Sequence, residues 1–416
     1  MAGLISARRQ VLRDYLSVIS GSAGRLVFSL AYFVILANAL SISEFGLFAT
    51  ASAAGVVLSR ILAFGFIAPL YRIATVKPHL IGAYTAGFLS MSAVSLPLLA
   101  LASSAVYFLF FNADMPPAAF AMVVGAEALL WRPTEAVIIV NNGLKRFGRG
   151  AFLTIFGTAI RALAAAIFVL SATRDLWSWT LFYAAANALS LAVGILFFYP
   201  RQKLRLKPVL YWRRLADSIY VACAEVVFYL QSELDKLLVL ALAGPYLAGI
   251  YAIIMRLVDL TAIPIRTFSV LLVQKMMRAP DILARLSLRF GIEAGVFIVS
   301  TLAMLALALL LHFLPEILGS NVAEAAPLVL LALLVPGFRN LMEYQAELLF
   351  ARGQTLLRAV NLVLLAGVKA ALLALILRDA PSADEIVRAL NWVFAALYLA
   401  SLLLTYYALR RPANRV

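Results

Sequence analysis

The stretch NLVLLAGVKAALLALIL, residues 361–377, decides the fold class of this chain. It carries one ionisable side chain, Lys369, in a run that is otherwise almost wholly apolar. About twenty residues of this kind form a helix that crosses the hydrocarbon core of a bilayer. Similar runs recur along the sequence, separated by short polar segments. They lie near residues 15–40, 45–71, 81–111, 118–141, 150–171, 177–199, 216–242, 246–274, 288–314, 322–350, 355–377 and 384–409.

The composition agrees with a chain that lies almost entirely in lipid. Of its 416 residues, 64% are hydrophobic and 13% are charged, whereas a soluble domain has about 25% charged residues. A soluble core could not enclose this much apolar side chain, so lipid must solvate it. We therefore predict an all-α polytopic membrane protein with about twelve transmembrane helices and no sizeable soluble domain.

The net charge of +15 is explained by the loops. No basic run is interleaved with aromatic residues, so we expect no nucleic-acid partner. Lys and Arg concentrate in every second loop, which is typical of cytoplasmic loops and predicts that both termini are cytoplasmic. Residues 1–15 are interpreted as the start of an uncleaved first helix, because the following apolar stretch is too long for a signal peptide. The basic loops contain Arg8, Arg9, Arg13, Arg72, Lys77, Lys145, Arg146, Arg149, Arg201, Lys203, Arg205, Lys207, Arg213, Arg214, Lys275, Arg278, Arg285, Arg289, Arg352, Arg358, Arg410, Arg411 and Arg415.

The longest connection, PRQKLRLKPVLYWRRL at 200–215, divides the sequence into two halves. We predict an N-terminal lobe of six helices at 1–200, a basic cytoplasmic linker at 201–215 and a second six-helix lobe at 216–416. The linker's charge fits contact with lipid headgroups.

The two halves share a weak internal similarity. SEFGLFATASAAGVVLSRIL, which opens the second run, parallels PYLAGIYAIIMRLVDLTAIP, which opens the eighth. Each places a glycine, Gly46 or Gly249, before an apolar-aromatic pair and an arginine, Arg60 or Arg256, further along the helix. This pattern is typical of transporters built from internal repeats, with the substrate bound between them.

Ionisable residues within the apolar runs are the candidate functional residues, because each costs roughly 2.5–3.5 kcal/mol at the centre of a membrane helix. Some have an opposite charge three or four positions away and are interpreted as neutralised within a helix; these are the pairs Arg256–Asp259, Arg132–Glu135 and Arg339–Glu343.

Other cations have no acidic residue at that spacing on their own helix: Arg25, Arg60, Arg161 and Lys369. A cavity with surplus cations suits an anionic substrate, and arginine binds phosphate bidentately. We predict a cationic substrate-binding cavity formed by Arg25, Arg60, Arg161 and Lys369.

The segment QSELDKLLVL places Glu233, Asp235 and Lys236 together on the seventh run. Glu233 and Asp235 are candidates for a coupling-ion or proton site, and a cluster that only stabilises the helix bundle is the alternative. We hypothesise that Asp235 pairs with Lys369 across helices, so that the lysine amine takes the place of a bound cation.

Other chemistry is not expected. Cys223 is the single cysteine, and His79 and His312 stand far apart, so we predict no disulfide, no metal site and no cofactor. The sequence has neither a G-x-x-x-x-G-K loop nor a credible Ser/His/Asp constellation. We therefore do not expect an enzyme.

Four stretches resemble one transporter family over nearly the whole chain. They are ISGSAGRLVFSLAYFVILANALSISEFGLFATASA (19–53), NNGLKRFGRGAFLTIFGTAIRAL (141–163), YLQSELDKLLVLALAGPYLAGIYAIIMRLVDL (229–260) and ELLFARGQTLLRAVNLVLL (347–365). In order and spacing they resemble the Wzx-like polysaccharide-transport branch of the multidrug/oligosaccharidyl-lipid/polysaccharide (MOP) exporter superfamily.

The resemblance implies two six-helix lobes related by pseudo-two-fold symmetry, as in MATE transporters, with access alternating between the two sides of the bacterial inner membrane. The implied substrate is an undecaprenyl-pyrophosphate-linked oligosaccharide, moved from the cytoplasmic to the periplasmic leaflet. The implied partners are membrane lipids, a polysaccharide polymerase and chain-length or export proteins.

The resemblance also carries residue roles. Related lipid II flippases hold the pyrophosphate with arginines on the first, second and eighth helices, and Arg25, Arg60 and Arg256 occupy the matching helices here. Some relatives bind sodium on the seventh, eleventh and twelfth helices. Asp235 fits the seventh helix, but the eleventh offers Asn361 and Lys369 without an acid, which argues against sodium coupling.

Three alternatives were weighed. A drug or organic-cation antiporter of the same superfamily would favour an acidic, aromatic-lined cavity, against which the arginine surplus argues. A membrane-embedded polysaccharide polymerase or ligase would carry a sizeable outward loop, whereas every predicted outward loop is short. A non-transporting component of a polysaccharide assembly complex is compatible with the sequence.

Overall fold

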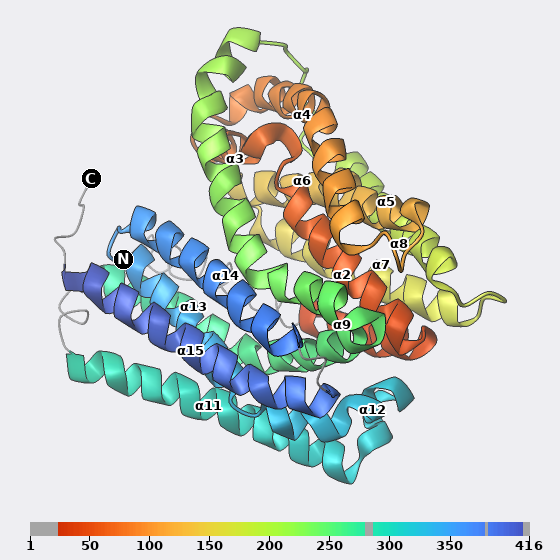
Figure 1. The fold of residues 1–416 in the computed structure, drawn as a ribbon. Helices are drawn as coiled ribbons and strands as arrows, with labels where there is room; N and C mark the ends of the chain where they lie inside the picture. The colour runs from red at the N-terminus through yellow and green to blue at the C-terminus, as the bar shows by residue number, and fades with distance from the viewer. Residues whose placement is uncertain (1–23, 279–285, 379–381, 411–416) are drawn as a thin grey trace, which may run out of the picture. The chain divides into compact units, whose positions relative to one another are not determined.

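The computed structural model describes residues 24–278, 286–378 and 382–410. Every secondary-structure element in these ranges is a helix, which confirms the all-α fold class (Figure 1). The chain divides into two compact units, Met1–Val226 and Val227–Val416, with the boundary inside helix α9. The predicted lobes at 1–200 and 216–416 stay a prediction.

Unit 1 is a bundle of helices joined by short turns. Its elements are the helix Gly24–Ala39, α2 (Ile42–Ser59), η1 (Leu62–Gly65), α3 (Ile67–Val76), η2 (Pro78–Leu80), α4 (Ile81–Phe110), α5 (Pro117–Gly125), the π-helix η3 (Ala126–Trp131), α6 (Arg132–Gly143), α7 (Phe147–Val169), α8 (Leu176–Val193), the π-helix η4 (Gly194–Phe198) and the first part of α9 (Pro208–Arg278).

Unit 2 contains the rest of α9 and five longer helices. These are α11 (Leu286–Phe313), α12 (Ser320–Val329), α13 (Val335–Ala351), α14 (Thr355–Arg378) and α15 (Ala383–Arg410), with short 3₁₀ turns η5 (Pro315–Leu318) and η6 (Leu330–Ala332). Helix α13 is central to this unit, because α11, α14 and α15 all pack against it.

Within the described ranges, 8 helices are long and apolar enough to cross a membrane, or 9 if the bent pair Ser320–Ala332 and Val335–Ala351 forms one span. One of them, Pro208–Ala262, has 55 residues and would be about 80 Å long if straight. Its backbone breaks at Gly244, with φ 83° and ψ 174°, between the two runs predicted at 216–242 and 246–274. The multi-pass architecture is thus confirmed, and the count of about twelve stays a prediction.

A capping box formed by Ser41 and Glu44 begins helix α2. The Ser41 side chain accepts a hydrogen bond from the Glu44 backbone N–H, and the Glu44 carboxylate accepts one from the Ser41 backbone N–H. This reciprocal capping box satisfies two backbone donors that have no partner inside the helix. The Glu44 carboxylate also accepts the Leu176 N–H at the start of α8, at 3.1 Å.

The prediction of one continuous helix at 45–71 is wrong. Helix α2 ends at Ser59, and Ala63, Phe64 and Gly65 follow in the left-handed region with φ of 57°, 48° and 74°. Such residues cannot continue a right-handed helix. The break is buried, and the Ala63 N–H finds a partner in the Ser95 hydroxyl at 2.9 Å. Gly65 is required there because a Cβ would overlap the Ser218 carbonyl oxygen.

The basic segment that follows α8 is held against the start of α4. The Gln202 side chain accepts the Gly82 N–H at 2.9 Å and donates to the Pro78 carbonyl at 3.0 Å. Gly82 allows this approach, because a Cβ would overlap the Lys203 carbonyl oxygen.

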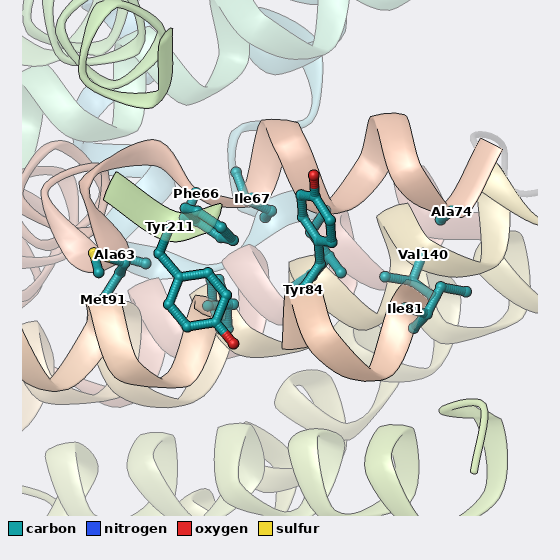
Figure 2. Close-up of a cluster of buried hydrophobic side chains, with 12 residues drawn as sticks. Ala63, Phe66, Ile67, Ala74, Ile81, Tyr84, Met91, Val140 and Tyr211 are labelled. Atoms are coloured by element: carbon teal, nitrogen blue, oxygen red, sulfur yellow. The ribbon is translucent and has the colours of Figure 1, made fainter. Parts of the chain in front are cut away.

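Tyr211, at the start of α9, lies in a buried hydrophobic cluster together with Phe66 (Figure 2). Its ring is 2% exposed and packs edge-on against Phe66. Its hydroxyl accepts the Lys207 N–H at 3.0 Å and lies 2.9 Å from the Ala83 carbonyl. One phenol therefore ties the basic segment to α4.

Tyr211→Phe is expected to loosen residues 201–207. The substitution keeps the ring but leaves the Lys207 N–H and the Ala83 carbonyl without the phenol, which costs about 1–3 kcal/mol for buried polar groups. We expect a melting temperature lower by a few degrees in detergent and faster trypsin cleavage after Lys203 and Arg205.

Tyr220→Phe is the matched control, because Tyr220 lies on the same helix and is 77% exposed. Equal trypsin sensitivity of the two variants would contradict the anchoring role of Tyr211.

Candidate functional site

The helix break in unit 1 places Arg60 in an ion network. Arg60 is the C-cap of α2, not a mid-helix residue as the sequence predicted. Its Nη1 lies 2.8 Å from Oε2 of Glu135 on α6. The same oxygen accepts from Arg132 Nη1 at 2.7 Å, which confirms the Arg132–Glu135 pair. Arg132 Nη2 binds Glu225 on α9 at 2.5 Å.

This network has two arginines and two glutamates, so its formal charges cancel. Arg60 and Arg132 are 3% and 1% exposed, whereas the Glu135 and Glu225 side chains are 26% and 31% exposed. Spacing within one helix could not show the Arg60–Glu135 pair, because the two residues lie 75 positions apart. Substrate binding by Arg60 stays a prediction, and a substrate phosphate would have to compete with Glu135.

Arg161, on α7, is held differently. Its guanidinium carbon lies 4.0 Å from the centre of the Trp131 ring and 5.6 Å from that of Tyr183. Its Nε donates to the Asn187 side chain at 3.2 Å. Its Nη2 is buried and has no hydrogen-bond partner, and within the described part of the chain Arg161 forms no ion pair. The guanidinium therefore retains unused donors.

A buried carboxylate is bonded to the hydroxyl of Tyr183. Glu127 is 3% exposed and accepts hydrogen bonds from Ser52 at 2.7 Å and from the Tyr183 hydroxyl at 2.5 Å. Glu127 and Trp131 both belong to the π-helix η3. Such insertions are frequent at functional sites.

In unit 2 the hypothesised pair is confirmed. Lys369 Nζ lies 3.2 Å from Asp235 Oδ2 and donates to the Gln231 carbonyl at 2.7 Å. Tyr251 donates to the same Asp235 oxygen at 2.8 Å. Lys369 and Asp235 are 3% and 2% exposed. The ammonium also lies 5.8 Å from the centre of the Phe394 ring, so the groups around it are those that would hold a small cation.

The remaining predicted residues lie elsewhere. Glu233 pairs with Lys236 one turn further along α9, and a coupling role for Glu233 stays a prediction. Arg25 has an exposed side chain on the helix Gly24–Ala39, and Arg256 is half-buried on α9. Both stay predicted substrate ligands.

A further pair on α9 joins two helices. Asp259 forms a 3.1 Å ion pair with Arg339 of α13. Each of these residues also has an oppositely charged residue three or four positions away on its own helix.

A cavity of about 470 Å³ lies between α4 and α5. Its lining is almost wholly apolar, with Tyr107, Phe108 and Phe120 among the residues around it. None of the predicted cations lines it, and an apolar groove of this kind on a membrane helix pair suits a lipid tail.

Glu293 is a buried ionisable residue that was not among the predicted site residues. It lies in the run predicted at 288–314, where the apolar character of the whole segment masked one carboxylate near its start. The structure buries this carboxylate at 3% exposure among tyrosines of α15. The available signal was the cost of an acid within an apolar run.

The Arg132 network is expected to be structural. Arg132→Gln leaves Glu225 and part of Glu135 without a counter-charge, and breaking a buried ion pair costs about 3–5 kcal/mol. We expect a strong loss of monodisperse protein by size-exclusion chromatography. Arg149→Gln, a change at an exposed position in the first turn of α7, is the control, and normal yield of Arg132→Gln would contradict the assignment.

The Lys369–Asp235 pair is expected to show coupling in a double-mutant cycle. Lys369→Met and Asp235→Asn each leave the other charge buried and unpaired, so each lowers thermal stability. The double variant removes both charges and should recover most of the loss. Lys77→Met, an exposed change, controls for the loss of one lysine, and purely additive effects would refute the pairing.

The comparisons with known proteins concern the fold. No protein-family model matches the chain, and no curated protein matches its sequence. Solved transporter structures do match it over nearly their whole length.

An inward-facing multidrug-resistance MATE family transporter of the MOP superfamily is 13% identical, with a TM-score of 0.61, and the match covers 94% of this chain and 98% of the other. A mutant of the Vibrio cholerae MATE transporter VcmN is 13% identical with a TM-score of 0.60, covering 99% and 98%. A MOP superfamily transporter from Pyrococcus furiosus is 13% identical with a TM-score of 0.56, covering 96% and 94%. The chain therefore has the MATE-like transporter fold.

Proposed function

We propose that this chain is a flippase of the bacterial inner membrane. It moves an undecaprenyl-pyrophosphate-linked oligosaccharide from the cytoplasmic to the periplasmic leaflet by alternating access, with both termini in the cytoplasm. The MATE-like fold supports transport, since the matched structures are transporters. The substrate class rests on the chemistry of the buried cations and on the resemblance of the sequence to polysaccharide transporters.

The observation that carries the proposal is that Arg161 is buried with an unused hydrogen-bond donor. Its charge is buried beside two aromatic rings, and its Nη2 has no partner among the described residues. Guanidinium groups bind the oxygens of phosphates in pairs and lose less hydration than ammonium groups. A pyrophosphate oxygen would satisfy this nitrogen, and the neighbouring indole offers an apolar face to a sugar ring.

The backbone near Arg60 supports the same reading. Transporters of this general kind often bind substrates where a membrane helix is interrupted. The break at residues 63–65 begins three residues after Arg60, which is the C-cap of α2. In our proposal Arg60 exchanges Glu135 for a substrate phosphate during transport, whereas Arg132 keeps its structural pairs.

The polarity of the binding pocket varies among the matched structures. One of the matched structures, the Pyrococcus furiosus transporter, is described as having a binding pocket of reverse polarity that suggests a different function. A change of pocket polarity is therefore compatible with this fold, and an anionic substrate is the change that a cationic site would support.

In this proposal Lys369 replaces a coupling cation at Asp235. The ammonium already donates to a carboxylate oxygen and to a carbonyl oxygen, and it faces an aromatic ring. A sodium ion would have to displace it, so we propose that no sodium binds at Asp235.

The competing function is drug or organic-cation antiport. It is favoured by one observation, the multidrug-resistance MATE transporter among the matched structures. The buried Glu127 beside Tyr183 would then bind a cation.

Deletion of the gene is expected to enlarge the pool of undecaprenyl-pyrophosphate-linked repeat units and to remove the surface polysaccharide. The pool is measured by lipid extraction and mass spectrometry. A wild-type copy should restore both, and Arg161→Gln should not, although the variant accumulates in the membrane.

Arg174→Gln is the matched control, because Arg174 is an exposed loop residue; it should complement fully. An unchanged pool together with increased sensitivity to cationic drugs would contradict the flippase and favour the antiporter. Full complementation by Arg161→Gln would remove the observation that carries the proposal.

A further inference from the structure

A second polar centre lies in unit 2, apart from the Lys369–Asp235 pair. It forms where α11, α13 and α15 pack together. Its centre is Glu293 on α11, which is 3% exposed. The Tyr398 hydroxyl donates to one carboxylate oxygen at 3.0 Å, and the Tyr406 hydroxyl donates to the other at 3.2 Å. Each oxygen thus has a neutral donor from α15.

The charge of Glu293 is not balanced by an ion pair within the described part of the chain, unlike the charges of Asp235 and Glu135. Asp235 has Lys369, and Glu135 has two arginines. Glu293 has no ion pair among the residues that the structure describes. The nearby Arg289 lies on the same helix, and its guanidinium is placed 5.1 Å from the centre of the Tyr406 ring instead.

The surroundings of Glu293 contain buried polar atoms without partners. The Tyr344 hydroxyl and both amide atoms of Gln345 have no hydrogen bond, and these residues are 1% and 0% exposed. The Gln345 amide lies close to the carboxylate, although its geometry falls short of a hydrogen bond. Such orphaned groups are rare in protein interiors and call for an unseen ligand or an alternative state.

The arrangement can serve both protonation states of a carboxyl group. A carboxylate needs donors, which Tyr398 and Tyr406 supply. A carboxylic acid also needs an acceptor for its O–H. The Gln345 side-chain oxygen has no hydrogen-bond partner and can supply this acceptor once the amide turns it toward the carboxyl group. Uptake of one proton removes the free-energy cost of a buried charge. A rigid structural carboxylate would need only the two tyrosine donors.

We propose that Glu293 is a reversible proton-binding site. A proton from water bonds to one carboxylate oxygen, and the resulting O–H turns toward the Gln345 carbonyl, while release restores the carboxylate held by the two phenols. The titratable or charged described side chains facing it are Arg289, Tyr344, Tyr398 and Tyr406.

A metal ion fits the centre less well than a proton. Within the described residues no three His, Cys, Asp or Glu side chains come together. One carboxylate beside an arginine provides little net negative charge for a cation, whereas a proton needs only one oxygen.

The proton bound at Glu293 would be the coupling ion for the proposed transport. This coupling role rests on the proposed function, whereas proton binding at Glu293 does not. Proton binding itself is tested without any substrate. Lowering the pH would then weaken the two phenol bonds, and the packing of α15 on α11 would respond.

The test is pH-difference infrared spectroscopy of the purified full chain in lipid. We expect the C=O stretching band of a protonated carboxylic acid to appear as the pH falls. The band should be lost in Glu293→Gln, an isosteric change, and kept in Glu316→Gln, which alters an exposed acid near the end of the same helix.

Tyr398→Phe provides a second measurement that does not depend on folding of the Glu293 variant. Loss of a donor to the charged form should move the midpoint of the band to higher pH by about one unit, a tenfold change in proton affinity. Tyr407→Phe, a 58% exposed neighbour on α15, should leave the midpoint unchanged.

Two results would overturn the proposal. One is an identical pH-dependent band in the wild type and in Glu293→Gln. The other is binding of radioactive sodium to the wild type that Glu293→Gln abolishes, which would make the centre a sodium site. A confirmed band together with an unchanged pool of lipid-linked repeat units in the deletion strain would keep the proton site and reject the flippase.

Discussion

The cost of placing charge in hydrocarbon governs the arrangement of this protein. Its helices carry arginine, lysine, glutamate and aspartate into segments that lipid must surround, and each such group costs several kcal/mol unless it finds a partner. The structure meets this requirement by pairing between helices. Arg132 holds two carboxylates from different helices, and Lys369 holds Asp235. These pairs determine which helix faces lie together, so the same contacts decide both the packing of the helices and the pairing of their charges.

Backbone irregularities place the charges where pairing is possible. The left-handed turn after Arg60 ends α2 within the bundle and brings its last residue to Glu135. The π-helix η3 brings Glu127 and Trp131 to Tyr183 and Arg161. A regular helix would rotate these side chains by a different angle per residue. Arg60 and Arg161, which we propose to bind substrate, therefore lie near η1 and η3, two of the interruptions in unit 1.

Much of the fold could be predicted from the sequence because lipid imposes a simple rule. Runs of about twenty apolar residues become helices, and the run at 355–377 corresponds to α14 at Thr355–Arg378. The break at residues 63–65 could not be predicted, since Ala63 and Phe64 are ordinary helix residues and only their buried contacts hold them in the left-handed region. Cross-helix pairs were predictable only where charge counting demanded a partner, as for Lys369. The Arg60–Glu135 pair and the tyrosines around Glu293 depend on packing between residues far apart in the chain, which periodicity cannot reveal.

The central claim is that this chain carries a pyrophosphate-linked glycan across a bilayer. The most direct test is translocation in vesicles that contain the purified protein and an undecaprenyl-pyrophosphate-linked oligosaccharide in both leaflets. A glycosidase added outside digests only the outer pool in protein-free vesicles. If the account is correct, the wild-type protein lets the enzyme digest nearly all of the glycan while the vesicles stay sealed. Digestion that stops at the outer pool, with protein that is folded and correctly inserted, would contradict the account.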